Sequence, residues 1–587
     1  MLSIFKRSSV AERLLFVLSI LFILVQVSLE LRIPSYMAEI TTLLQQPGTT
    51  TADVMKPGFI MIGLSLLSFA FAILVGFFAA RIAAGLTTRV RGQLFNQVTQ
   101  FSTNEIQHFS VPSLVTRTTN DLTQIQLLIA MGLQVIIKGP ITAIWAITKI
   151  SNKSWEWTAT TAIAVTFLLV TISILMAFVR PKFAMIQKLT DNLNSVTRES
   201  LTGLRVIRAY NAEAYQEEKF EKANEELTSV NLFTGRMMSI LNPVMTLVST
   251  GLTLAVYVIG AFLIQNAVGA DKITLFSDMV VFTSYAMQVV MGFMMMTMIF
   301  FILPRAVVSA NRINEVLGLF SSIAFTDKKT APSKIKGKIT FDDVSFAYPN
   351  AAESVLHHIS FEAKTGDTVA LIGSTGSGKS TILKLIPRLF DTTQGNILLN
   401  GKNVKEYDHE TLNNIIGYIP QKPVLFSGDI RSNMELGRSF ASPLDEAAIL
   451  DALEIAQAKD FVEREEGQLA AHVAQAGSNF SGGQKQRLAI SRVIARQPEI
   501  LLFDDSFSAL DYQTDKKLRA ILKERLPQTT KLIVAQRIST IMDANLIIVL
   551  EEGRIVGKGT HHELLKDNQI YQEIAYSQLS KEELVNE

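Results

Sequence analysis

A glycine-rich segment near the middle of the chain has the composition and spacing of a phosphate-binding loop. It reads Gly-Ser-Thr-Gly-Ser-Gly-Lys-Ser over residues 373–380, after an apolar run at 368–372 and before a helical run at 381–389. Glycines let backbone N–H groups wrap phosphate oxygens at a helix N-terminus, where the helix dipole also favours negative charge. In this pattern the lysine reaches the β- and γ-phosphates of a nucleotide, and the serine hydroxyl binds Mg²⁺. The expected nucleotide contacts are Gly373, Ser374, Thr375, Gly376, Ser377, Gly378, Lys379, Ser380 and Thr381.

A pair of carboxylates follows a second apolar run, Ile500–Phe503, as Asp504 and Asp505. Four successive apolar residues are typical of a strand buried in a parallel sheet. Ligands bind at the carboxyl ends of such strands in open α/β sheets. We therefore expect Asp504 to hold Mg²⁺ together with Ser380, as the acidic strand end does in phosphate-loop NTPases. A helix cap by Asp505 is the structural alternative for the second carboxylate.

The elements that must position these groups form an alternating pattern in the second half of the chain. Short β-rich runs alternate there with helical stretches, which predicts an α/β domain with a largely parallel sheet. The runs are 339–346, 368–372, 500–503 and 531–534. A segment containing Lys328, Lys329 and Lys334, residues 322–336, precedes them and reads as a linker.

The first half of the chain has a different solvent. A helix that spans a bilayer needs about 20 mostly apolar residues, and six segments approach or exceed that length. They are Leu14–Leu29, Pro57–Ala80, Ile125–Ile137 (continuing past Lys138 to Thr148), Trp157–Val179, Met237–Ala270 and Met279–Pro304. Six such segments in the first 305 residues favour a helical membrane domain over a set of buried soluble helices.

The loops between the apolar segments predict the orientation in the membrane. Residues 81–124 and 180–236 are long, polar and rich in Arg and Lys, whereas 34–54, 149–156 and 271–278 are short with few positive charges. The positive-inside rule places the long loops, the N-terminus and the second half in the cytosol. Apolar residues recur at helical spacing within the long loops, so we expect two cytosolic helical hairpins. A bacterial plasma membrane is the expected location.

Composition excludes several classes of function. The chain has 587 residues, a net charge of +2 and no cysteine. Without cysteine there are no disulfides, thiol nucleophiles, thiolate metal sites or cysteine-peptidase module, and the near-zero charge gives no reason to expect nucleic acid as a partner. The basic start, Met1–Arg13, runs directly into an apolar segment without a small-residue cleavage site, which indicates a membrane anchor rather than a signal peptide.

A third motif supplies a family resemblance. Phe480–Gln484 reads Phe-Ser-Gly-Gly-Gln, is followed by Lys485–Arg487, and resembles the signature of ATP-binding-cassette ATPases. Tyr348 resembles the aromatic residue that stacks on adenine, Gln421 the Q-loop glutamine that touches Mg²⁺, and 508–511 the D-loop. The signature residues expected to contact the nucleotide held by a partner subunit are Ser481, Gly482, Gly483 and Gln484.

The resemblance covers almost the whole chain and implies the type IV ABC exporter architecture. That architecture is an all-α six-span transmembrane domain followed by an α/β phosphate-loop nucleotide-binding domain. We expect the transmembrane domain at 1–321, the linker at 322–336 and the nucleotide-binding domain at 337–587, with ATP and Mg²⁺ as cofactors. Phe109–Arg117 and Ala209–Phe220 are the candidate coupling helices that dock on the ATPases in this family.

Two departures from the family pattern concern the same hydrolytic step. The family has a glutamate general base after the Mg²⁺ aspartate, whereas this chain has Asp505, which is one methylene shorter. A base must come within hydrogen-bond reach of its proton. The family also has a switch-loop histidine near the γ-phosphate, whereas this chain has Gln536, which cannot carry a proton or a charge. We therefore predict a degenerate ATP site.

The degenerate site predicts a particular kind of assembly. ATP sites in this family lie between two subunits, so the intact signature motif of this chain completes a competent site on a different partner. The resemblance is to heterodimeric bacterial multidrug exporters, and it predicts a second ABC half-transporter as partner and a small amphiphilic substrate. The alternatives are a homodimeric lipid or peptide exporter and an ATP-gated regulator or channel.

The membrane half carries weaker signals about a substrate path. Tyr285, Gln288, Gly292 and Met295 recur on one helical face of the last apolar segment, among further methionines. Flexible thioethers suit surfaces that accept varied apolar partners, although ordinary helix packing explains a methionine stripe equally well. Lys138 is a charge inside the third segment, and such a charge faces a cavity or a partner or snorkels to the interface.

Overall fold

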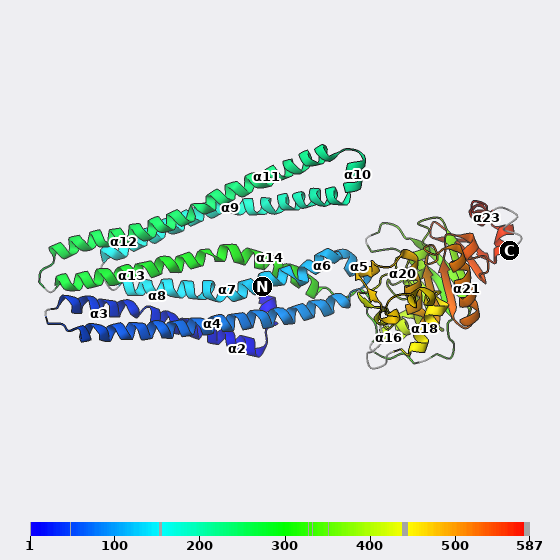
Figure 1. Cartoon of the computed structure of the whole chain (residues 1–587), viewed down its shortest axis with the longest axis horizontal. Helices are drawn as coiled ribbons and strands as arrows, with labels where there is room; N and C mark the ends of the chain where they lie inside the picture. Colours follow the sequence, from blue (N-terminus) through cyan, green and yellow to red (C-terminus); the bar gives the residue numbers. More distant parts are fainter. Residues whose placement is uncertain are drawn as a thin grey trace. The chain divides into compact units, whose positions relative to one another are not determined.

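The chain divides into two compact units (Figure 1). The first unit is Met1–Thr99 with Val111–Leu319, and the second is Gln100–Ser110 with Phe320–Glu587. The computed structural model describes residues 2–46, 48–151, 155–269, 271–326, 328–331, 333–349, 351–436 and 444–579. Residues 327 and 332 of the predicted linker therefore lie outside the described residues.

Within its described residues, the first unit contains helices and connecting turns but no strands. Its helices are α1 (Leu2–Phe5), α2 (Val10–Glu30), α3 (Ile33–Gln45), α4 (Thr51–Thr99), α6 (Val111–Thr118), α7 (Asn120–Gly132), the π-helix η1 (Leu133–Lys138), α8 (Gly139–Ile150), α9 (Trp155–Thr202), α10 (Leu204–Ala209), α11 (Glu213–Ser239), α12 (Leu241–Asn266), α13 (Asp271–Thr297) and α14 (Ile299–Gly318). Helices α9 and α11–α12 form a long antiparallel pair that turns at α10 (Figure 1).

Within the described residues, six helical stretches are long and apolar enough to cross a membrane. They are Val10–Gln45, Thr51–Thr99, Val111–Ile150, Trp155–Thr202, Glu213–Asn266 and Asp271–Gly318. Each apolar segment predicted from the sequence falls on one of these stretches, so the prediction of six spans is confirmed. The hydrophobic core of this unit includes Ile23, Trp157, Val256, Phe282 and Val289.

The polar loops continue the spans as helices, which confirms their predicted helical character. Helix α4 has 49 residues, about 74 Å at 1.5 Å per residue, whereas a hydrocarbon core is only about 30 Å thick. Most of its polar end therefore lies outside the apolar layer. The candidate coupling helices are less regular than predicted. Phe109–Arg117 breaks at Ser110 (φ 57°) between α5 (Thr103–Phe109) and α6, and Ala209–Phe220 contains a turn at Asn211 (φ 50°).

A π-helical segment interrupts the third span. It is η1, and Lys138 is its last residue; π-segments inside helices occur frequently at functional sites. The next residue, Gly139, lies against Gly292 of α13, because a Cβ built at Gly292 would be 2.9 Å from the Gly139 carbonyl oxygen. These two glycines therefore bring the third and sixth spans into backbone contact.

The second unit is built around two larger sheets. Its strands are β1 (Ile339–Phe346), β2 (Leu356–Ala363), β3 (Thr368–Gly373), β4 (Gln394–Leu399), β5 (Lys402–Asn403), β6 (Ile416–Ile419), β7 (Gly428–Asp429), β8 (His472–Val473), β9 (Ile500–Asp504), β10 (Thr530–Val534), β11 (Leu546–Glu551) and β12 (Arg554–Gly559). One sheet has the order β12-β11-β3-β10-β9-β6 and is parallel except for β12. The predicted parallel sheet is therefore confirmed, but β1 belongs to a separate antiparallel sheet, β2-β1-β4-β5.

Helices and short 3₁₀ turns surround these sheets. They are α5, α15 (Lys379–Leu385), α16 (His409–Ile415), α17 (Ile430–Met434), α18 (Glu446–Ile455), α19 (Lys459–Val462), α20 (Gly482–Ile494), α21 (Tyr512–Arg525), α22 (His561–Asp567) and α23 (Gln569–Tyr576), with η2 (Val404–Glu406), η3 (Gln468–Ala470), η4 (Gln475–Gly477) and η5 (Ile538–Thr540). Helix α5 joins this unit through Ser102 and Glu105, which contact Ser322 by hydrogen bonds of 3.0 and 3.2 Å.

The parallel sheet brings the predicted site residues to one edge. Every residue of β9 and β10 is buried, and the register pairs Val534 with both Asp504 and Leu371. Because parallel strands all end at the same edge of a sheet, the carboxyl ends of β3, β9 and β10 lie together. Ligands bind at this edge in open α/β sheets.

Candidate functional site

The glycine-rich loop joins β3 to α15 in a conformation that needs its glycines. Gly378 has φ +96°, and a Cβ there would lie 2.5 Å from the Leu356 side chain. Gly373 has φ +151°, and a Cβ there would lie 2.0 Å from the Leu550 carbonyl oxygen. Only glycine takes such backbone angles without strain. The loop therefore turns tightly into the N-terminus of α15, the geometry that binds phosphate.

Lys379 lies across this loop. Its Nζ donates to the carbonyl oxygens of Gly373 and Ser374 at 2.9 and 2.6 Å, and to Ser377 Oγ at 3.3 Å. Burial lowers the pKa of Lys379, and the carboxylates of Asp505 and Asp504 oppose that shift. The ammonium is thus held over the loop that would receive the phosphates.

Asp504 receives two hydroxyl groups. Ser380 Oγ donates to its Oδ1 at 2.5 Å, and Tyr418 OH donates to its Oδ2 at 3.0 Å. Hydroxyl and carboxylate oxygens are ligands that Mg²⁺ prefers, and Mg²⁺ is usually held by one or two carboxylates plus substrate phosphates. Within the described residues, no group of three or more His, Cys, Asp or Glu side chains gathers to hold a metal. The pair Ser380–Asp504 therefore fits a Mg²⁺ that is completed by nucleotide phosphates rather than an all-protein metal cage.

Asp505 has a different environment from its neighbour. Its Oδ2 accepts from Gln421 Nε2 at 3.0 Å and from Gln536 Nε2 at 2.9 Å. Its backbone has φ 50°, and its N–H donates to the Val534 carbonyl at 3.1 Å. Burial raises the pKa of Asp505, as does the nearby charge of Asp504, whereas the hydrogen bond from Gln421 acts in the opposite direction. One oxygen of Asp505 is therefore engaged by two neutral amides.

Tyr348 lies beside the N-terminal turn of α15, the helix that follows the glycine-rich loop. Its hydroxyl is 3.0 Å from Thr381 Oγ1, and its ring packs edge-to-face against Phe346 and Phe390 with centroid separations of 4.9 and 5.2 Å. Together with the carboxylates and amides described above, the predicted residues of the phosphate-loop site thus lie at one edge of the sheet.

The signature motif forms the start of another helix, α20. Ser481 is its N-cap, and a capping box joins Ser481 and Gln484, with Ser481 N–H donating to Gln484 Oε1 at 2.8 Å. Gly482 has open space around its Cβ position, and a Cβ at Gly483 would lie 3.4 Å from the Ala509 carbonyl. In the described part of the chain, the hydrogen bonds of Ser481 and Gln484 stay within this cap and do not reach the phosphate loop.

Comparison with known proteins gives the family. Residues 16–293 match the family described as the ABC transporter transmembrane region, and residues 356–508 match the family described as ABC transporter. An uncharacterized ABC transporter ATP-binding protein of Mycobacterium tuberculosis is 37% identical over 90% of this chain and 90% of its own length. This chain belongs to the ABC transporter family. It is an exporter half-transporter, in which one membrane domain precedes one ATPase domain, and a multi-pass membrane protein.

Two further comparisons bear on the architecture and the class of this ABC transporter. A bacterial Atm1-family ABC exporter solved with ATP bound has a TM-score of 0.80 and 24% identity, covering 96% of this chain and 98% of its own, and it confirms the exporter fold. The ATP-dependent lipid A-core flippase of Pseudomonas aeruginosa is 29% identical over 84% of this chain and 80% of its own length. Membership in the family implies nucleotide binding, with Mg²⁺ as the usual partner of the nucleotide.

Two residues of the site in this ABC transporter were not predicted from the sequence. Tyr418 donates to Asp504, and burial raises the pKa of Tyr418. Gln578, after α23, receives a hydrogen bond from Ile538 N–H at 2.8 Å and donates to the Gln536 carbonyl at 2.8 Å. Tyr418 was recoverable only with the strand order, because β6 pairs with β9. Nothing in the sequence pointed to Gln578, which also borders a cavity of about 490 Å³ beside Asp505 and Gln536.

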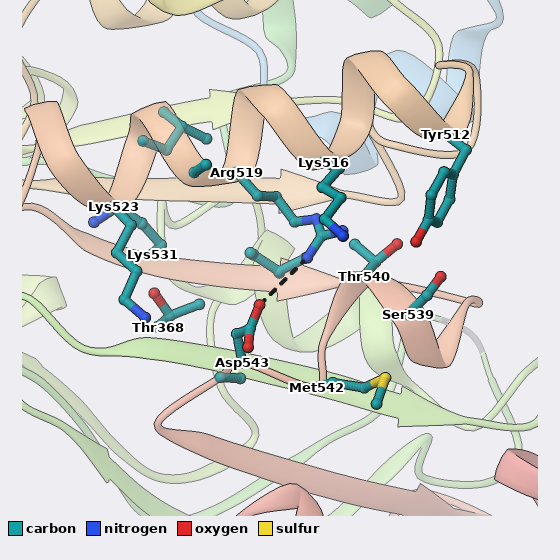
Figure 2. Close-up of a pocket in the computed structure, with 14 residues that line it drawn as sticks. Thr368, Tyr512, Lys516, Arg519, Lys523, Lys531, Ser539, Thr540, Met542 and Asp543 are labelled. Carbon is teal, nitrogen blue, oxygen red and sulfur yellow. Dashed lines mark ion pairs between the residues drawn. The ribbon is translucent and has the colours of Figure 1, made fainter. Parts of the chain in front are cut away.

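Another pocket, of about 400 Å³, lies beside α21 and contains none of the predicted site residues (Figure 2). Arg519 forms ion pairs with Asp515 at 2.9 Å and Asp543 at 3.9 Å. Lys531 is buried, which lowers its pKa to about 8, and its Nζ donates to the carbonyls of Leu526 and Thr529. Because Leu526 is the C-cap of α21, Lys531 caps the helix end, a structural role for a basic residue.

Proposed function

We propose that this half-transporter pairs with a different half-transporter to form an ATP-driven exporter of amphiphilic compounds, with a multidrug range of substrates. It contributes a degenerate ATP site together with the signature motif that completes a competent site on the partner. The observation that carries this proposal is the contact between Asp505 and Gln536. Where the family pattern has glutamate and histidine, this chain has a buried aspartate hydrogen-bonded to two neutral amides.

The geometry supports slow hydrolysis at the chain's own site. A general base must accept a proton from water within hydrogen-bond reach, and a misplacement of about 1 Å can reduce rate on the order of 10²-fold. Asp505 is shorter than glutamate, and its Oδ2 already accepts two hydrogen bonds. The Gln536 amide is neutral, and unlike a histidine it neither takes up nor releases a proton during the reaction. Asp505 and Gln536 can therefore hydrogen-bond to a water molecule and orient it, but they do not activate it as a nucleophile.

The remaining site residues keep the roles that bind nucleotide. The loop N–H groups and Lys379 bind phosphates, Ser380 and Asp504 hold Mg²⁺, and Tyr348 stacks on the adenine. Gln421 donates a hydrogen bond to Asp505, and we assign it to the bound Mg²⁺ as the Q-loop glutamine. Ser481, Gly482, Gly483 and Gln484 contact the nucleotide of the partner's site. Closure of the two ATPase domains turns the membrane cavity outward, and hydrolysis at the partner's site resets it.

The Arg- and Lys-rich loops support an orientation in the plasma membrane with the ATPase domain in the cytoplasm.

The test of the assembly is ATPase turnover in reconstituted membranes. We expect this chain alone to turn over at least tenfold more slowly than the same chain purified with its partner half-transporter. Restoring the pattern with Asp505→Glu and Gln536→His should raise the turnover of the lone chain. Full turnover by a well-behaved homodimer of the unmodified chain would overturn the proposal.

A homodimeric lipid exporter is the second candidate, because the Pseudomonas relative is a lipid A-core flippase. The two candidates differ in composition as well as rate. Native mass spectrometry of the complex isolated from its source membrane shows either two copies of this chain or one copy with a second polypeptide. Two copies that translocate a labelled lipid would favour the lipid exporter.

A further inference from the structure

A cavity of about 370 Å³ lies inside the membrane unit between the first, third and sixth spans. We call it the intramembrane cavity. It is lined by Glu30 and the start of α3, by Lys138 and Thr142 around η1 and α8, and by Gln288, Met291, Gly292 and Met295 of α13, helices that Figure 1 shows in the same bundle. Its volume falls within the range of small-molecule pockets. The structure thus brings together Lys138 and most of the α13 face that the sequence singled out.

The two charged side chains at this cavity, Lys138 and Glu30, form an ion pair with each other. Lys138 Nζ donates to Glu30 Oε1 at 3.0 Å, and the same oxygen accepts from Gln26 Nε2 at 2.9 Å and Ser68 Oγ at 3.1 Å. Ionisable residues inside a membrane are costly and mark functional sites by default. Because this ion pair sums to zero, it leaves no net charge with which to neutralise an ionic ligand.

Two polar atoms of the cavity wall lack hydrogen-bond partners. Gln288 Oε1 and Thr142 Oγ1 are buried without a hydrogen-bond partner, and both residues line the cavity. An unsatisfied buried polar group costs about 1–3 kcal/mol. Rotation of the Gln288 amide or the Thr142 hydroxyl toward the cavity would present either a donor or an acceptor to a ligand. Met291, Met295 and Pro34 supply an adaptable apolar wall around them.

We propose that the intramembrane cavity is a binding subsite for an uncharged amphiphile whose polar head carries hydroxyl or amide groups. The head hydrogen-bonds to Gln288 and Thr142, and the apolar body packs on the methionines of α13. The Lys138–Glu30 pair sets the charge preference, because a charged head would leave a net charge in a low-dielectric site. This inference rests on the proposed exporter function in one respect, which is that the bound amphiphile is a transported substrate. Binding of the amphiphile to the cavity does not require ATP.

The test is equilibrium binding to the full chain in lipid nanodiscs, with empty nanodiscs subtracted. Three probes share one ten-carbon chain: monodecanoylglycerol is neutral, decanoate is anionic and decyltrimethylammonium is cationic. We expect saturable binding of the neutral probe that the two charged probes do not displace. Gln288→Leu and Thr142→Val should each weaken it by about 3- to 10-fold, the value of one neutral hydrogen bond. Gln134→Leu, the same change in η1 but outside the cavity lining, is the matched control.

The charge preference gives a readout that a purely structural ion pair would not move. Lys138→Met leaves Glu30 unbalanced and should shift the preference to the cationic probe, whereas Glu30→Gln should shift it to the anionic probe. Unchanged binding in Gln288→Leu would mean that the cavity holds only water, and equal loss in Gln134→Leu would mean a nonspecific effect; either result overturns the proposal. If either charge variant fails to fold, the Gln288 and Thr142 variants still decide it. Because no turnover is measured, failure here leaves the heterodimer proposal standing.

Discussion

The nucleotide site and the intramembrane cavity satisfy their polar groups in opposite ways. In the nucleotide site Lys379 donates hydrogen bonds to loop carbonyls. Asp504 accepts from two hydroxyls, and Asp505 accepts from two amides. In the intramembrane cavity the Lys138–Glu30 pair is closed, while Gln288 and Thr142 each keep a buried atom without a partner. The polar groups of the first site are already arranged by contacts within the chain, in a geometry that suits phosphate. The second site keeps two polar atoms that a ligand head group could hydrogen-bond.

The largest expected effect tests the pre-organisation of the nucleotide site. Lys379→Ala removes the ammonium that lies across the loop, and contacts of a charged group are worth about 1.5–3 kcal/mol. We expect ATP affinity to fall by roughly 10- to 100-fold, measured with a fluorescent ATP analogue on the full chain. Lys523→Ala, in the pocket beside α21 (Figure 2), is the control and should leave affinity unchanged. Equal losses in both variants would place nucleotide recognition outside the loop.

The second prediction tests whether the membrane ion pair is a closed unit. Lys138→Met leaves Glu30 in the membrane without its partner, which should destabilise the chain by about 2 kcal/mol, less than the loss of a fully buried partner because Glu30 is partly exposed. The double variant Glu30→Gln with Lys138→Met removes the pair together and should recover most of that loss. Thermal unfolding in nanodiscs measures both. Additive losses in the double variant would show that the two residues act separately.

The same contrast explains how much of the molecule was predictable from sequence. The phosphate loop, Asp504 and the signature could be predicted because each is a short motif of residues that are contiguous in the sequence. The six spans were legible because bilayer thickness fixes their length. Tyr418 and Gln578 were not, because their contacts depend on strand order and on a C-terminal segment 40 residues from Ile538. The Lys138–Glu30 pair joins residues 108 positions apart, and no local pattern encodes that contact.

The third prediction separates the two adjacent carboxylates. Asp504 contacts the Ser380 hydroxyl, so Asp504→Asn should reduce the Mg²⁺-dependent gain in nucleotide affinity by about tenfold, the value of one charge-assisted contact. Asp505→Asn should change that gain by less than about threefold, because Asn Oδ1 can accept from the same neutral amides. Nucleotide titrations with and without Mg²⁺ give both values. A larger effect at Asp505 would assign Mg²⁺ binding to the second carboxylate.

The smallest expected effect concerns the support of the switch loop. Gln578 holds the loop through two hydrogen bonds of 2.8 Å, one to the carbonyl of Gln536 and one from the N–H of Ile538. Because the Gln536 side chain in turn donates to Asp505, loss of Gln578 should let that contact open more often. Gln578→Ala removes about 1 kcal/mol of hydrogen bonding, so amide exchange over residues 535–540 should accelerate about fivefold.

Gln572→Ala is the matched control for Gln578→Ala, because Gln572 also donates its amide to backbone carbonyls, those of Leu565 and Lys566, but away from the switch loop. A double variant with Gln536→Ala distinguishes positioning from general stability. If Gln578 acts through Gln536, Gln578→Ala should speed nucleotide release from the otherwise unmodified chain but not from the Gln536→Ala background, since the Gln536–Asp505 contact is already gone there. The same increase in nucleotide release in that background, or equally fast amide exchange in Gln572→Ala, would show that Gln578 is only a general anchor of the C-terminal segment.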